Sequence, residues 1–135
     1  MESIFDWVRS LFLFRGSGYT DQEILEFSNL NGTHSNLTSV HPDIDLLVNL
    51  KKLDLSHNQL TCLPESLGNL SNLKVLDIQN NRLNDQAENV LKTLVMTNSK
   101  IVKLSTDGFD FWEELERNRR GEPAPGGITA KAPKE

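Results

Sequence analysis

Few side chains in the sequence have the types that chemistry requires, and their spacing does not assemble a catalytic or metal site. His34 and His57 lie 23 residues apart and could come together in a repeating structure. A zinc site needs three or four ligands, and the corresponding later positions hold Asn80 and Lys103, which supply none. Cys62 has no histidine placed beside it, so we expect a buried structural cysteine and not a nucleophile.

Two further patterns also do not amount to a catalytic or ligand-binding site. The segment Gly16-Ser-Gly18 lacks both the spacing and the following Lys-Ser/Thr of a phosphate-binding loop. The neighbouring acids Glu113 and Glu114 are expected on a solvated helix face. The sequence therefore predicts no enzyme, no cofactor and no metal.

Composition narrows the class of protein. The chain has 135 residues, enough for one domain, and its net charge of -5 argues against a nucleic-acid partner. With Cys62 as the single cysteine no intrachain disulfide can form, which favours a reducing compartment. The first fifteen residues carry Glu2, Asp6 and Arg9 among their apolar residues, so we expect neither a secretory signal nor a spanning helix. These features predict a cytoplasmic protein.

An internal repeat of 23 residues organises the chain. Of 21 apolar scaffold positions in the units that begin at Phe27, Leu50 and Leu73, 18 are filled, against about 8 expected by chance at this composition. A weaker fourth copy is suggested by Met96, Ser99 and Ile101. The two clearest copies are Leu50-Lys-Lys-Leu53-Asp-Leu55-Ser-His-Asn58-Gln-Leu60 and Leu73-Lys-Val-Leu76-Asp-Ile78-Gln-Asn-Asn81-Arg-Leu83.

These copies resemble the leucine-rich-repeat family, whose motif is Leu-x-x-Leu-x-Leu-x-x-Asn-x-Leu. The continuation Leu60-x-x-Leu63-Pro64-x-x-Leu67 is similar to the 23-residue subclass of intracellular repeat proteins. The resemblance covers residues 24–105. It implies an α/β fold, a short solenoid with a parallel concave sheet, and a role in binding proteins through the concave face. Regulatory subunits, immune receptors and bacterial effectors delivered into host cells are examples.

The spacing itself explains such a fold. Leu53 and Leu55 are two residues apart, so both face inward from one strand. Asn58 and Asn81 fall where a buried amide can satisfy the backbone of the neighbouring turn, whereas Ser35 and Leu104 replace this Asn in the outer units. We expect parallel strands near residues 28–32, 51–55, 74–78 and 98–103, and a helical return over residues 84–95.

The open ends of a solenoid need caps. We expect an N-terminal helical cap in residues 1–23, a C-terminal capping helix in residues 106–120 and a disordered tail in residues 121–135. In the first cap, residues 3–14 would place Ile4, Val8, Leu11 and Phe12 on one side of a helix. In the second, Asp107 would cap a helix whose inner side holds Phe109, Trp112 and Leu115.

The outward positions of the strands form the candidate site. Lys51 and Lys74 are predicted to be neighbours, as are Asp54 and Asp77, with Asn31 and Lys100 beside the aspartates. A protein partner would dock on this polar strip; the alternative is a solvated surface whose like residues stack because the repeats were duplicated. The predicted partner-binding residues are Asn31, Lys51, Lys52, Asp54, His57, Lys74, Asp77, Asn80 and Lys100.

A second class of function stays open. The alternative is a structural scaffold that self-associates through the apolar N-terminal helix, either in solution or at a membrane surface. Such a surface helix would carry a Lys/Arg-rich polar face, and here Glu2 and Asp6 offset Arg9 and Arg15, so we do not expect membrane contact. The sequence leaves the oligomeric state undetermined.

Overall fold

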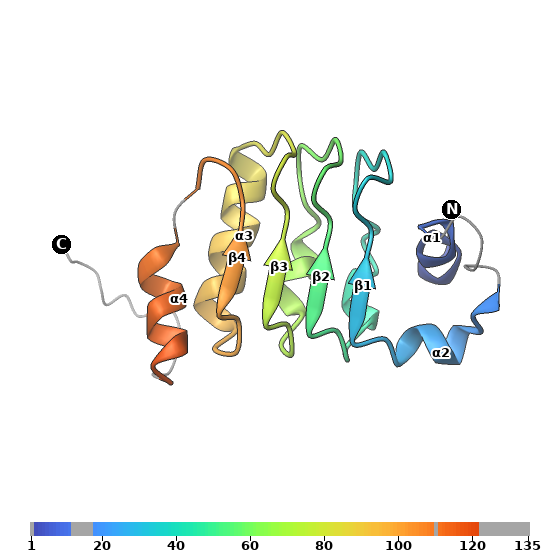
Figure 1. The fold of residues 1–135 in the computed structure, drawn as a ribbon, viewed down its shortest axis with the longest axis horizontal. Coiled ribbons are helices and arrows are strands. Elements are labelled where there is room, and N and C mark those ends of the chain that lie inside the picture. Colours follow the sequence, from blue (N-terminus) through green and yellow to red (C-terminus); the bar gives the residue numbers. More distant parts are fainter. Residues whose placement is uncertain (1, 12–17, 110, 122–135) are drawn as a thin grey trace.

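The computed structural model describes residues 2–11, 18–109 and 111–121. Four short strands form one parallel sheet in the order β1-β2-β3-β4, and 3-10 or α-helical segments return the chain behind it (Figure 1). The elements in chain order are α1 (Ile4–Ser10), α2 (Asp21–Leu25), β1 (Asn29–Asn31), η2 (Ile44–Leu46), β2 (Lys52–Asp54), η3 (Glu65–Asn69), β3 (Val75–Asp77), α3 (Asp85–Thr97), β4 (Lys103–Ser105) and α4 (Trp112–Arg119).

The register of the sheet follows the repeat for three strands and departs from it at the fourth. Leu30, Leu53 and Leu76 lie side by side at 23-residue steps, as predicted. The next partner in this row is Leu104, which is 28 residues beyond Leu76. The prediction of a strand over 98–103 was therefore wrong, because β4 begins later.

The helix α3 explains the longer last unit. The earlier returns contain only the short 3-10 segments η2 and η3, whereas α3 has 13 residues. An α-helix advances only about 1.5 Å per residue, against about 2.0 Å in a 3-10 helix and more in extended chain. More residues are therefore needed to cross the same distance. As predicted, this return is helical, and the Asn84 side chain accepts a hydrogen bond from the Ala87 amide at its start.

The core lies between the sheet and the return segments. Each repeat contributes leucines that are fully buried, such as Leu53 and Leu55 from the strand and Leu63 and Leu67 from the return. Since neither face of a single repeat could enclose these side chains, stacking of neighbouring repeats removes them from water. The apolar pattern thus fixes which strand positions remain available on the open side.

Helices α1 and α2 lie beyond β1, and α4 lies beyond β4 (Figure 1). Ile4, Trp7 and Val8 of α1 are buried. The lack of a side chain at Gly32 leaves room for Leu11, which follows α1, and for Leu55. A Cβ at position 32 would lie 3.3 Å from Leu11 Cδ1 and 3.1 Å from Leu55 Cδ2. The expectation for Phe12 and the rest of the predicted helix as far as residue 14 lies outside the described residues.

At the other end, Phe111 and Leu115 are each 7 % exposed, and the Asn118 side chain donates to the carbonyls of Asn98 and Ile101. The prediction that Asp107 caps this helix was wrong, because its carboxylate accepts from the Asn80 amide at 2.6 Å. The helix instead begins after Phe111 without a side-chain cap. The side chain of Trp112 and residues 122–135 lie outside the described part of the chain.

Candidate functional site

The open sheet face consists of the outward strand side chains, which alternate with the buried leucines. The register places two rows across this face. One row holds Asn29, Lys52, Val75 and Lys103, and the other holds Asn31, Asp54, Asp77 and Ser105. Asn31, Asp54 and Asp77 are therefore neighbours as predicted, but Ser105, and not Lys100, lies next to Asp77. The longer last repeat is the reason for this difference.

The aspartates of this face have a structural task that sequence reasoning missed. Asp54 Oδ1 accepts from the Ser56 amide at 3.0 Å and from the Ser56 hydroxyl at 2.6 Å. Asp77 Oδ1 accepts from the Gln79 amide at 3.1 Å. Each carboxylate thus holds the turn that ends its own strand, a local bond typical of Asp. A lysine at position 77 would break this bond as well as reverse a charge.

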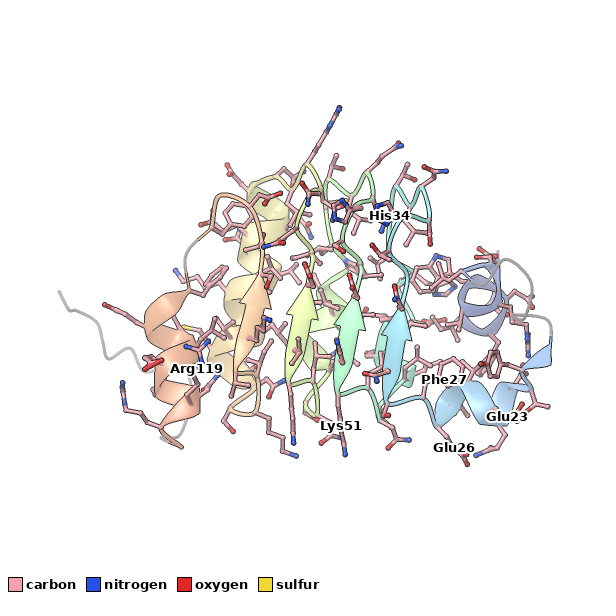
Figure 2. All side chains as sticks on the ribbon, in the orientation of Figure 1. Glu23, Glu26, Phe27, His34, Lys51 and Arg119 are labelled. Atoms are coloured by element: carbon pink, nitrogen blue, oxygen red, sulfur yellow. The ribbon has the colours of Figure 1, made fainter. Side chains whose placement is uncertain are left out.

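A group of lysines occupies the edge of the sheet where the strands begin. Lys51 and Lys74 precede β2 and β3 at equivalent positions, so they are neighbours as predicted. They line an open depression together with Lys100, Asn49, Asn72 and Glu26, which we call the basic depression. Figure 2 shows Lys51 and Glu26 at this same edge of the molecule.

Two asparagine side chains of the basic depression are held in place by hydrogen bonds to backbone carbonyls. The Asn49 side chain donates to the Leu25 carbonyl at 3.0 Å, and the Asn72 side chain donates to the Val48 carbonyl at 2.9 Å. Lys100 Nζ donates to Asn72 Oδ1 at 2.8 Å. Lys100 is therefore held beside the other lysines at this edge, and not beside the aspartates.

The opposite edge, where the strands end, carries the histidines. The rings of His34 and His57 are stacked with centroids 4.4 Å apart and an interplanar angle of 8°. Asn80 continues the column, with Nδ2 3.4 Å from His57 Nε2. All three residues adopt left-handed backbone, with φ of 55°, 58° and 61°. Within the described ranges no group of three or more metal-ligating side chains was found.

The position of Cys62 differs from the expected one. We expected a buried structural cysteine at this position, but Cys62 is exposed. Leu60 and Leu63 on either side of it are buried, and Thr61 beside it is exposed. In this stretch only the leucines turn inward.

Two polar residues that sequence reasoning missed join neighbouring repeats, one from an exposed and one from a buried position. Gln86, which interrupts the apolar pattern, accepts from the Leu63 amide at 2.9 Å and donates to the Leu63 carbonyl at 2.8 Å. Asn98 is 3 % exposed and donates to the carbonyls of Leu70 and Leu73, both at 2.9 Å. The 23-residue register placed Asn98 on the outer face, so its bonds to the preceding repeat were missed.

The second class of function loses its basis in the placement of α1. Its apolar residues Ile4, Trp7 and Val8 contribute to the core and do not form an exposed docking face. Arg9 joins the N-terminal helices, because its guanidinium binds the carboxylates of Asp6 and Asp21. The Asp21 hydrogen bond, more than any other contact, raises the pKa of Arg9. Among the described residues, no helix is long and apolar enough to cross a membrane.

Comparison with known proteins agrees with the repeat geometry. Residues 48–90 match the family model of leucine-rich repeats, in two copies. These residues span β2, η3, β3 and the start of α3, which include both clear copies of the motif. No curated protein matches the chain. With its parallel strands, buried leucines and asparagine ladder, the chain contains two leucine-rich repeats at residues 48–90.

Proposed function

We propose that the chain is a protein-interaction module, and not an enzyme, whose partner docks on the open sheet face. Leucine-rich repeats commonly bind proteins, and stacked repeats create extended surfaces for this purpose. The main support for this proposal is the row formed by Lys52 and Lys103 with the half-buried Val75 between them. This row has charged flanks for specificity and an apolar centre for contact. It corresponds to the concave face of the predicted solenoid.

The proposal extends to the remaining predicted site residues and to the ends of the domain. Asn31, Asp54 and Asp77 form the second row of the docking face, and His57 and Asn80 lie at its border. In this proposal the N-terminal helices and α4 cap the repeats, because both carry buried apolar residues at the ends of the sheet (Figure 1). A single cysteine favours a reducing compartment, so we place the module in the cytoplasm.

The test compares partner capture by matched charge variants. Tagged full-length chain is incubated with extract of the cells that express it, and retained proteins are quantified by mass spectrometry. The Lys52→Glu/Lys103→Glu variant should lose a protein that the wild type retains, because it reverses both flanks of the row. The control Arg82→Glu/Lys92→Glu reverses two exposed charges away from the open sheet face and should retain that protein.

Circular dichroism must show that both variants melt near the wild-type temperature, since exposed charges add little stability. Equal capture by the wild type and the Lys52→Glu/Lys103→Glu variant would contradict docking on the open sheet face. Equal loss in both double variants would mean that net charge, and not this face, governs capture.

A further inference from the structure

The basic depression holds three lysines and one glutamate, so it is positive overall on a protein whose net charge is negative. The chain carries a net charge of -5, yet Lys51, Lys74 and Lys100 converge at the edge where the strands begin. Equivalent positions on neighbouring strands are about 4.8 Å apart. Lys51 and Lys74 occupy such positions, because Lys74 N donates to the Lys51 carbonyl at 2.8 Å. Like charges this close repel each other unless an anion lies between them.

Among the described residues, no carboxylate forms an ion pair with Lys51, Lys74 or Lys100. The ion pairs within 4.0 Å that the structure describes join Arg9 to Asp6 and Asp21, and Arg119 to Glu116. Lys100 Nζ is bonded to a neutral amide, that of Asn72. The three ammonium groups are therefore available to an external anion, and Asn72 holds one of them in place.

We propose that the basic depression binds an acidic segment of the protein partner, a run of Glu or Asp side chains; this inference rests on the proposed function. Carboxylates are the charge-complementary ligand for ammonium groups. On a helix, carboxylates at positions i and i+4 lie about 5–6 Å apart, a step close to the spacing of the strands. The acidic segment lies along the edge where the strands begin, while the rest of the partner covers the open sheet face.

Glu26 fixes where this acidic segment ends. It occupies the position that is equivalent to Asn49, Asn72 and Lys100 in the following repeats, and it lines the same depression. Its carboxylate repels an acidic ligand at the β1 end, so the segment extends from Lys51 toward Lys100. Binding in the depression therefore depends on the position of the acidic run as well as on its charge.

The charge of the whole chain favours a short acidic peptide over a large polyanion. Nucleic acids and anionic membranes bring many negative charges, which the net charge of -5 repels beyond the immediate depression. A membrane surface also favours an amphipathic helix with a Lys/Arg-rich face, and the lysines here come from three separate repeats. A peptide of a few residues experiences mainly the local lysines.

The first test measures binding of fluorescein-labelled hexaglutamate to the full-length chain by fluorescence anisotropy. Replacing Lys51, Lys74 and Lys100 together by Gln should raise the dissociation constant by about tenfold, which corresponds to three exposed ion pairs lost. Lys92→Gln on α3 removes one exposed positive charge elsewhere and should leave the constant unchanged. Labelled hexaglutamine is the neutral control peptide and should not bind.

For a second variant, Glu26→Gln, we expect tighter binding of hexaglutamate. Glu26→Gln removes the repelling carboxylate but keeps an oxygen that can accept from the Gln22 side chain, as Glu26 does at 3.2 Å. Hexaglutamate should then bind about twofold more tightly, as expected when one exposed like-charge contact is removed. Unchanged or weaker binding would contradict the role of Glu26 in ending the acidic segment at the β1 side.

Three results would overturn the inference: no binding of hexaglutamate, equal binding by the wild type and the triple Gln variant, or lysine-dependent binding to phosphatidylserine vesicles without hexaglutamate binding. Sedimentation that shows lysine-dependent self-association would assign the depression to a second copy instead. These outcomes are separable from the proposed function. Partner capture that depends on Lys52 and Lys103 can persist when hexaglutamate fails, and hexaglutamate can bind when no partner is captured through the open sheet face.

Discussion

Asn58 and Asn81 each join two neighbouring repeats through both polar atoms of one side chain. Asn58 Oδ1 accepts from the amides of Ser35 and Leu37, both at 2.9 Å, and its Nδ2 donates to three carbonyls. Asn81 accepts from the Leu60 amide and donates in the same manner. The turn after each strand would otherwise bury backbone groups without partners.

We expect Asn58→Ala to lower the free energy of unfolding by about 1–3 kcal/mol, because several buried backbone groups lose their partner at once. Urea denaturation followed by circular dichroism measures this change. Asn29→Ala is the control, since Asn29 is an exposed residue of β1 and its loss should be nearly silent. Equal midpoints for Asn58→Ala and the wild type would show that water replaces the amide at no cost.

Asp77 separates the structural role of a side chain from its charge. Asp77→Ala should destabilise the chain by about 1 kcal/mol, because the Gln79 amide loses its acceptor. Asp77→Asn keeps an acceptor oxygen and should stay close to the wild type in the same urea titration. If Asn and Ala cost the same, the carboxylate acts through its charge and not through this hydrogen bond.

At the scale of elements, α1 distinguishes a core helix from a docking helix. Trp7 is 7 % exposed, and its ring centroid lies 6.3 Å from that of His41. Trp7→Ala should therefore destabilise the fold by about 3 kcal/mol, the low end for loss of a buried aromatic side chain. Glu2→Ala removes an exposed side chain from the same segment and is the control. A thermal midpoint unchanged by Trp7→Ala would restore α1 as a free surface.

The sequence was sufficient to locate β1, β2 and β3, because Leu30, Leu53 and Leu76 recur at a constant interval. It was not sufficient for β4, because the interval was assumed to continue. The alternative was visible in the sequence, since Ile101 and Leu104 have the same spacing as Leu73 and Leu76. Periodicity reports the inward leucines but not the residues that a helix adds between them, so the position of Lys100 was also wrong.

The contacts of the candidate site were less predictable than its position. Register alone placed Lys51 next to Lys74, and Asp54 next to Asp77. It could not show that Asp54 binds Ser56, or that Lys100 is held by Asn72, because these contacts depend on turn geometry and on the longer last repeat. The exposure of Cys62 was missed for the same reason: the irregular return has no period from which to infer direction.

For the whole molecule, each repeat is stabilised mainly by its neighbours. β2 and β3 have a paired strand on both sides, whereas β1 and β4 lie at the ends of the sheet, and Leu104 is only half-buried. We expect native-state hydrogen exchange to be slowest at the Leu55 and Ile78 amides and faster toward β1 and β4. Faster exchange in β2 than in β4 would contradict a stability that is greatest at the centre.

The change from a 23-residue to a 28-residue interval also determines where the array could grow by gene duplication. A copy of residues 50–72 inserted before β3 would follow a unit of its own length and would meet the longer α3 unit as residues 50–72 do now. Its Asn58 would find the same backbone groups as Asn81 does now. The same copy inserted after residue 100 would separate α3 from α4, which pack against each other, and would part Asn98 from the Asn118 side chain that binds its carbonyl. Lineages that lengthen or shorten this protein should therefore vary in the number of repeats ahead of α3 and keep the terminal helical unit intact.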